Sequence, residues 1–375
     1  MKKRPVWAII FGLLLAAFTA YLLLDMFVIR RTGQDNASEM NLSVFDGITP
    51  AVTPKPATET DADTKTDAGT EEEAGAETGE NAGRAVSEPE TEETEAPPTT
   101  TPTVFPENAL TPIPLNGTDE GILQPEANFT EEEIITGNTW TNDHISLTLA
   151  SYREHDTNLY VADIYVTSAE YIKTAFAEDT YGRNIFEKTS EIAESKNAVF
   201  AVNGDDYGAR EGGYVIRNGV IYREVGNTNR ETLSLLADGS FLITEYNEAY
   251  PNELLKKGAW QCWTFGPTLL KNGEIAVTAT QEVDYAMAKN QRTVIGIIEP
   301  LHYVIIVSDG RTDESTGLSL YEIADFMKRY GVVTGYNLDG GGSSTMYFDG
   351  RIINCPTADG RKIKEREISD ILYVG

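Results

Sequence analysis

Apolar and polar residues alternate with the period of short strands over much of the C-terminal two thirds of the chain. The stretches ISLTLASYR at 145–153 and NLYVADIYVTS at 158–168 alternate or run apolar, as does AVFAVN at 198–203. Such runs are typical of β-strands. The stretch NIFEKTSEIAESKN at 184–197 instead spaces its apolar residues with a helical period, so we expect a helix there.

Turn signals in the same part of the chain indicate how the strands connect. Four pairs separate short apolar runs: Asn218-Gly219, Asp238-Gly239, Asn272-Gly273 and Asp349-Gly350. Because Asn, Asp and Gly tolerate the positive φ of tight turns, each pair predicts an antiparallel hairpin. The pairs do not establish a sequence repeat.

One helix is marked at both of its ends. Ser319 and Glu322 have the spacing of a capping box, the apolar positions that follow share one face, and Gly331 suits the C-terminal end. Together with the hairpins, this helix predicts an α+β fold. Its core would be a strand-rich, mixed or antiparallel sheet with a few helices.

The N-terminal segment 1–30 combines basic residues with an apolar run at 6–24. Such a run matches the ~20 residues that cross a bilayer core, and basic residues before it favour a cytoplasmic N-terminus. We therefore predict an uncleaved, single-pass membrane anchor, preceding an extracellular folded domain. A cleaved signal peptide is the alternative.

Residues 31–128 are rich in Thr, Glu, Ala, Pro and Gly and hold most of the net charge of −29. With so few apolar residues, the segment is predicted to be a disordered linker. The folded domain would then span 129–375. An acidic chain without a basic stripe does not favour nucleic acid as a partner.

Cys262 and Cys355 are the only cysteines. An exported domain could pair them, and two free thiols are an equally good interpretation. There is no C-x-x-C motif and there are only three histidines, so a zinc site is not expected. We predict no metal and no cofactor, although carboxylates without histidine would allow calcium. The oligomeric state stays open.

Three loops follow strand-like runs and combine carboxylates with glycine. They begin at Asn203, Asp309 and Asp339. In the third loop the aspartate is followed by Gly340, Gly341, Gly342, Ser343 and Ser344. A single Asp-Gly pair is usually only a turn, but the N–H groups of successive glycines can approach an anion closely. The residues alone therefore indicate a site for an anion or a sugar.

Longer motifs carry a resemblance to a known family. They are NLDGGGSSTMYFDG at 337–350, NQRTVIGI at 290–297 and VNGDDYG at 202–208. Taken in chain order, from 202 to 350, they resemble the phosphodiester glycosidase family over 197–375. The family reads N-G-G-F-F where this chain has Asn203-Gly204-Asp205-Asp206-Tyr207. The resemblance implies a hydrolase that cleaves the bond between the anomeric carbon of a sugar and the bridging oxygen of a phosphodiester.

The implied reaction assigns roles to the loop residues. Asp339 would be the base or nucleophile and Asp309 the second catalytic carboxylate. Arg292 would hold the phosphate with its planar fork, and a structural ion pair is its alternative role. The glycines with Ser343 and Ser344 would complete the anion site. Asn203 and Asp205 would bind sugar hydroxyls, and a solvated turn is the alternative for the aspartate.

The expected substrate is a sugar-1-phosphodiester of the GlcNAc-1-phosphate type in cell-envelope or exopolysaccharide material. Two other functions fit the same residues. One is a surface module that binds such glycans without cleaving them. The other is a phosphodiesterase that cuts the P–O bond instead.

Overall fold

The structure is a computed structural model that describes residues 6–27, 29, 31–34, 39–48, 112–113, 122–226, 229–280 and 289–375. The predicted linker 31–128 therefore lies largely outside the described residues. The α-helices are α1 Val6–Phe27, α2 Thr189–Ser195, α3 Pro251–Lys256 and α4 Leu320–Tyr330. The 3-10 helices are η1 Leu42–Phe45, η2 Ala169–Tyr171, η3 Ala177–Asp179, η4 Tyr207–Ala209 and η5 Gly341–Ser343.

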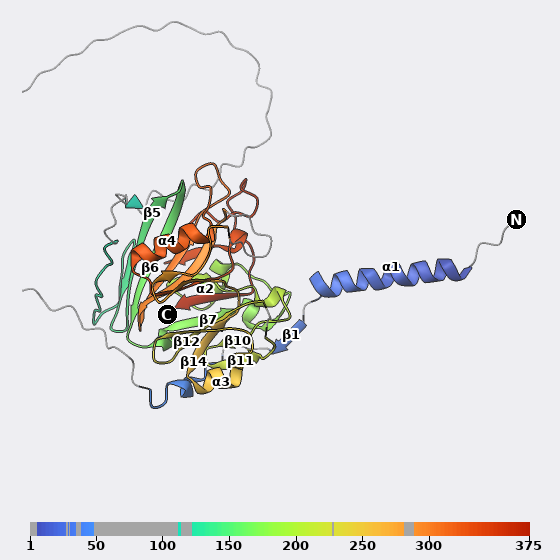
Figure 1. Cartoon of the computed structure of the whole chain (residues 1–375), viewed down its shortest axis with the longest axis horizontal. Helices are drawn as coiled ribbons and strands as arrows, with labels where there is room; N and C mark the ends of the chain where they lie inside the picture. The colour runs from blue at the N-terminus through green and yellow to red at the C-terminus, as the bar shows by residue number, and fades with distance from the viewer. Residues whose placement is uncertain are drawn as a thin grey trace, which may run out of the picture.

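Strands make up most of the fold, as Figure 1 shows. The largest sheet has the order β16 Glu274–Ile275, β15 Thr268–Lys271, β19 Thr334–Asn337, β17 Arg292–Glu299, β18 His302–Ser308, β6 Thr157–Val166, β5 Ile145–Glu154, β4 Thr139–Thr141 and β3 Ile134–Ile135, with β2 Pro112–Ile113 pairing β5. A second sheet has the order β11 Val220–Arg223, β10 Val215–Arg217, β14 Ala259–Trp263, β12 Thr232–Leu236 and β13 Phe241–Thr244. A third has the order β21 Arg351–Ile352, β20 Met346–Phe348, β9 Phe200–Asn203, β22 Asp370–Val374 and β7 Ile172–Phe176. A two-stranded sheet joins β1 Arg31–Gln34 to β8 Tyr181–Arg183.

The predicted α+β class, with a largely antiparallel core and a few helices, is confirmed. Among the described strands, only the pair of β2 and β5 is parallel. One apolar core draws side chains from all three larger sheets, including Leu147 of β5, Trp260 of β14 and Phe200 of β9. These side chains are fully or almost fully excluded from solvent. The sheets are therefore held together by a shared core.

All four predicted hairpins are present. Asn218, Asn272 and Asp349 have φ of 50°, 54° and 46°, and the glycine after each is also left-handed. Such pairs of positive φ angles are those of the turn type that matches the twist of two antiparallel strands. The local turn chemistry was sufficient to predict these connections.

The helix expected after Ser319 is α4, and its caps are as predicted. The Ser319 hydroxyl accepts a hydrogen bond from the Glu322 amide at 3.2 Å, and the Glu322 carboxylate accepts one from the Ser319 amide at 2.8 Å. Gly331 ends the helix with φ 96°. The helix predicted within 184–197 is shorter than its apolar pattern suggested, since α2 covers only Thr189–Ser195.

The N-terminal apolar run forms α1, which lies apart from the folded body in Figure 1. Across the described part of the chain, we find no helix with both the length and the apolarity needed to cross a membrane. The predicted membrane anchor is therefore not supported by the structure.

Part of the predicted linker packs against the folded domain. The Asn41 amide donates to the Asn218 carbonyl oxygen at 2.8 Å. The rings of Phe45 and Trp260 meet edge to face with their centroids 5.1 Å apart. Because Val44 and Phe45 supply apolar surface to the main core, residues 41–48 behave as part of the fold.

The cysteine question is settled in favour of free thiols. Cys262 is buried in β14 and Cys355 is half-buried, and neither forms a disulfide. Burial raises the pKa of both thiols to about 12. A thiol with such a pKa is not activated as a nucleophile.

Candidate active site

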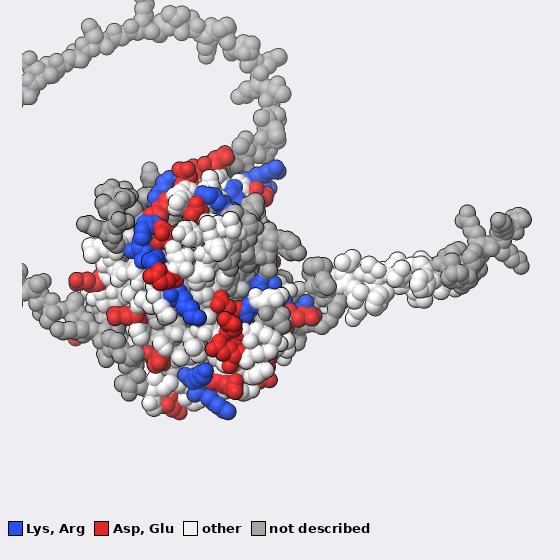
Figure 2. Space-filling model, viewed as in Figure 1, with Lys and Arg blue, Asp and Glu red and all other residues white. Residues whose placement is uncertain are grey.

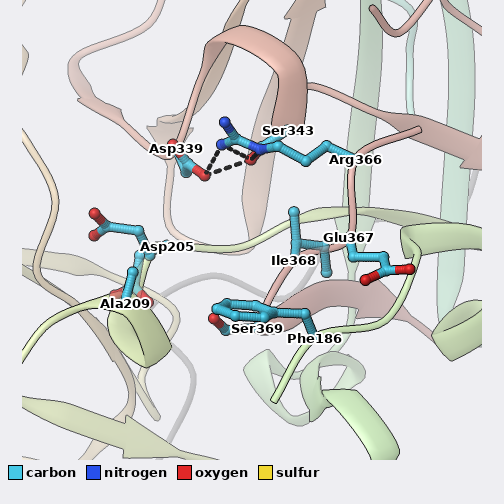
Figure 3. Close-up of a pocket in the computed structure, with 10 residues that line it drawn as sticks. Phe186, Asp205, Ala209, Asp339, Ser343, Arg366, Glu367, Ile368 and Ser369 are labelled. Atoms are coloured by element: carbon cyan, nitrogen blue, oxygen red, sulfur yellow. Dashed lines mark hydrogen bonds and ion pairs between the residues drawn. The ribbon is translucent and has the colours of Figure 1, made fainter. Parts of the chain in front are cut away.

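One pocket brings together two of the three loops singled out in the sequence. Its volume is about 460 Å³. It is lined by Phe186, Asp205, Asp206, Ala209, Asp339, Ser343, Arg366, Glu367, Ile368 and Ser369. Figure 3 shows Asp339, Ser343 and Arg366 together on one side of this space, and Phe186 with Ile368 on another, beside Glu367. A pocket with a polar and an apolar wall suits a sugar, which has hydroxyl edges and C–H faces.

Asp339 is held at the pocket by the neighbouring loop. The Asn203 side-chain amide donates to the Asp339 carbonyl oxygen at 2.6 Å, and the Asp339 amide donates to the Gly204 carbonyl oxygen at 3.3 Å. The ends of β9 and β19 are thereby joined. Asn203 itself is fully buried and does not line the pocket. Its side chain holds Asp339 in place, and its predicted contact with sugar hydroxyls stays a prediction.

The Asp339 carboxylate faces a hydroxyl and a guanidinium. Its Oδ2 accepts hydrogen bonds from Ser343 Oγ at 2.5 Å and from Arg366 Nη2 at 2.9 Å. Arg366 Nε also donates to Ser343 Oγ at 2.9 Å. Figure 3 shows this three-residue group. Burial raises the pKa of Asp339, while Arg366 and Ser343 act in the opposite direction. The carboxylate is desolvated, as a reactive group would be.

Asp206 is a second carboxylate in the same pocket. Burial and the nearby charge of Asp339 raise its pKa to about 6, although Arg210 and Arg230 favour the charged form. Arg210 pairs with one carboxylate oxygen. The other, Oδ1, is buried without a hydrogen-bond partner and lies 3.7 Å from Arg230 Nη1. A carboxylate with a pKa near neutrality and an unused oxygen is suited to proton transfer.

Asp205 also lines the pocket, but both of its oxygens are engaged. Oδ1 accepts a hydrogen bond from Arg217 Nη2 at 2.9 Å, and Oδ2 accepts one from the Thr264 amide at 3.0 Å. Arg217 Nε also donates to Asp370 Oδ2 at 2.8 Å. Arg217 is 1% exposed, so one buried cation fixes two carboxylates beside the pocket.

The three glycines have a structural role that the sequence did not reveal. A Cβ on Gly340 would lie 2.9 Å from the Gln291 carbonyl oxygen, and one on Gly342 would lie 3.1 Å from Ala358. Gly341 has φ 61°. The glycines therefore allow neighbouring chain segments to pack against this turn. We call Gly340–Gly342 the glycine turn.

Two residues predicted for the site lie elsewhere. Arg292 is 2% exposed at the start of β17, where its Nε donates to the Leu318 carbonyl oxygen at 2.9 Å. Asp309 is also buried, accepting hydrogen bonds from the Cys355 amide at 2.7 Å and Tyr160 Oη at 3.1 Å. Burial raises its pKa to about 6. Neither side chain lines the pocket.

Ser344 is likewise buried behind the pocket, where its Oγ accepts a hydrogen bond from Thr293 Oγ1 at 3.1 Å. The arginine that does reach Asp339 is Arg366, which sequence reasoning missed. It lies in the stretch GRKIKEREIS before the last strand, where neither periodicity nor a motif marks it. The only signal was its position within the family-like region.

Among the described residues, no group of three or more His, Cys, Asp or Glu side chains could hold a metal ion. The charged chemistry of the pocket is instead a set of aspartates facing arginines. Figure 2 shows positive and negative side chains interspersed on the visible face.

Comparison with known proteins covers the region that supplies every lining residue of this pocket except Phe186. Residues 196–375 match the model of the phosphodiester glycosidase family. This part of the chain is similar to that family. The resemblance found in the motifs is thereby confirmed.

Individual relatives agree with the family match. The chain is 29% identical over 201 residues to a SPbeta prophage-derived uncharacterized protein of Bacillus subtilis, covering 52% of this chain and 30% of that protein. It is 26% identical over 190 residues to bovine N-acetylglucosamine-1-phosphodiester alpha-N-acetylglucosaminidase, covering 44% of this chain and 34% of the bovine protein. The chain thus spans about a third of the length of these relatives.

A solved structure of the zebrafish N-acetylglucosamine-1-phosphodiester alpha-N-acetylglucosaminidase catalytic domain, auto-inhibited by its pro-peptide, is also similar. The match has 20% identity and a TM-score of 0.49, and it covers 61% of this chain and 82% of that one.

Proposed function

We propose that this chain hydrolyses sugar-1-phosphodiesters by breaking the bond between the anomeric carbon and the bridging oxygen. The observation that carries the proposal is the pair of desolvated carboxylates, Asp339 and Asp206, in one pocket. Two carboxylates are the usual machinery for an oxocarbenium-like centre. The mammalian relatives are named for this linkage, which supports the substrate class.

In this proposal Asp339 faces the anomeric carbon. Ser343 and Arg366 keep its carboxylate oriented and favour its charged form. When the C–O bond breaks, its electron pair leaves with the phosphate monoester. That group is already a stabilised anion, so it needs little help from an acid. The main proton transfer is then from the water that adds to the sugar.

Asp206 is our candidate for accepting that proton. Its Oδ1 has no hydrogen-bond partner, whereas both oxygens of Asp205 are engaged. A base with a pKa near 6 is ionised at neutral pH and can still bind a proton in the transition state. Asp309, predicted to be the second carboxylate, is used by Tyr160 and the Cys355 backbone instead.

Hydrolysis of a GlcNAc-1-phosphodiester in ¹⁸O-labelled water tests the bond that breaks. Attack at carbon places the label in the sugar, and mass spectrometry should find it there. Label in the phosphate ester would instead establish a phosphodiesterase. No turnover at all, together with measurable sugar-phosphate binding, would establish a glycan-binding module.

The variant Asp339→Asn tests the assignment of the first carboxylate. It keeps the shape and removes the charge, so turnover should fall by at least ~10²-fold while the fold persists. Asp349→Asn is the matched control, because Asp349 lies in an exposed hairpin turn that Asn also tolerates. Equal activity of the two variants would assign the role elsewhere.

The extracellular location and the cell-envelope or exopolysaccharide source of the substrate are further parts of the proposal. They rest on the composition of residues 1–128.

A further inference from the structure

Arg311 is a second arginine at the glycine turn, on the loop that follows β18. A Cβ on Gly341 would lie 3.3 Å from Arg311 Nη2, and one on Gly342 would lie 3.6 Å from Arg366 Cδ. Two arginine side chains therefore approach adjacent residues of one turn. Only Arg366 is also part of the pocket lining, so Arg311 lies beside the pocket.

The contacts of Arg311 leave much of its hydrogen-bonding capacity unused. Its Nη1 donates to the Ala358 carbonyl oxygen at 2.8 Å. Its Nε is buried and has no hydrogen-bond partner. Among the described residues, no carboxylate lies within ion-pair distance of this guanidinium. A buried N–H donor without a partner costs free energy. The donor that lies at the glycine turn, where a ligand could meet it, is Nη2.

The charge balance points the same way. Arg366 pairs with Asp339, but no acid compensates Arg311 in the described structure. Burial lowers the pKa of Arg311, and the positive charge of Arg366 lowers it further. The two guanidiniums thus repel each other across the glycine turn. An anionic group bound between them would offset this repulsion.

We propose that Arg311 and Arg366 together bind the phosphoryl group of the substrate over the glycine turn, outside the sugar pocket. This inference rests on the proposed function for the identity of the ligand. Arg366 already uses Nε and Nη2 on Ser343 and Asp339, so its Nη1 and the Nη2 of Arg311 are the donors left for the two non-bridging oxygens of the phosphoryl group. The subsite replaces the role that the sequence assigned to Arg292.

The test is the affinity of the full-length protein for inorganic phosphate, measured by calorimetry. Arg311→Gln removes the charge and should weaken phosphate binding by at least ~10-fold, the value of a charge-assisted hydrogen bond. Arg351→Gln is the matched control. Arg351 also donates to one carbonyl oxygen, that of Gly137 at 3.3 Å, and has no acidic partner among the described residues. Its substitution should leave phosphate affinity within about twofold of the wild type.

Neutral N-acetylglucosamine serves as the second probe, because Arg311 also holds the Ala358 loop. A specific phosphate site predicts unchanged sugar affinity in Arg311→Gln and partial recovery of phosphate affinity in Arg311→Lys. Equal weakening of both probes, or phosphate binding that does not depend on Arg311, overturns the subsite. If phosphate binding depends on Arg311 and no phosphodiester is cleaved, the subsite stands and the proposed reaction fails.

Discussion

Asp206→Asn is expected to make the protein more stable at alkaline pH while reducing its activity. The substitution keeps the shape of the side chain and removes its charge. Asp206 shares the pocket with Asp339 and is surrounded by little water, since its side chain is 16% exposed. The wild-type protein therefore holds two like charges close together above pH 6, and the variant holds one.

The size of the effect follows from the pKa. Burial and Asp339 raise the pKa of Asp206 from 3.8 to about 6. The folded state therefore binds this proton more tightly than the unfolded state does. The stabilisation is complete below about pH 4 and is lost as the pH rises through about 6. The shift of the pKa from 3.8 to about 6 corresponds to at most about 3 kcal/mol of stability, since one unit of pKa is worth about 1.4 kcal/mol.

The assay is urea unfolding of the wild type and the variant at about pH 4 and about pH 8. Because Asn resembles the protonated acid, the free energies of unfolding should nearly agree at pH 4. At pH 8 the variant should be more stable by about 1–3 kcal/mol. Other titrating carboxylates, such as Asp309 and Asp370, contribute to both proteins and largely cancel in the difference.

Asp325→Asn provides the control, because Asp325 likewise precedes its arginine partner, Arg329, by four residues but is 43% exposed. This variant should gain no stability at pH 8. The wild-type kcat/KM should rise with pH through about 6, as Asp206 ionises, and the Asp206 variant should lose that limb with about 10²-fold of its rate. A variant that is less stable than the wild type at pH 8 would refute the electrostatic argument.

Two further predictions concern residues behind the pocket and before the domain. Arg217→Met should lower the free energy of unfolding by about 3–5 kcal/mol, because Asp205 and Asp370 lose a shared buried cation. Denaturant unfolding measures this change. A loss below about 1 kcal/mol would contradict the structural role of Arg217. Phe45→Ala should cost about 1–2 kcal/mol through its lost contact with Trp260. A shortened protein that begins at residue 129 should lose the same stability, because it lacks Phe45. If proteins with and without residues 39–48 unfolded at the same temperature, the packing of Phe45 on Trp260 would be excluded.

Features set by short-range chemistry could be predicted from the sequence. The hairpin at Asn218 and the caps of α4 depend on residues within a few positions of each other. Asp339, which lines the pocket, is marked in the sequence by the unusual run of glycines after it. In each case the deciding contacts are local, so the pattern and the structure carry the same information.

The partners of Asp339 could not be predicted in the same way. Arg366 follows it by 27 residues and reaches it only because the chain before β22 folds back over the glycine turn. Arg292 has the residue type that phosphate binding needs, but its place in β17 points it to the Leu318 carbonyl oxygen. The partner that a side chain meets across the fold is a tertiary property, which the spacing of residues in the sequence does not encode.

Electrostatics around the pocket must also be reconciled with the charge of the whole chain. A protein with a net charge of −29 repels an anionic phosphodiester at long range. At physiological salt, however, charges more than about 8 Å apart are largely screened. The arginines at the glycine turn act within that distance and in a partly desolvated setting, where each interaction is stronger. Substrate binding is therefore expected to depend on these few arginines, and removing distant acidic residues should alter the rate of association more than the affinity.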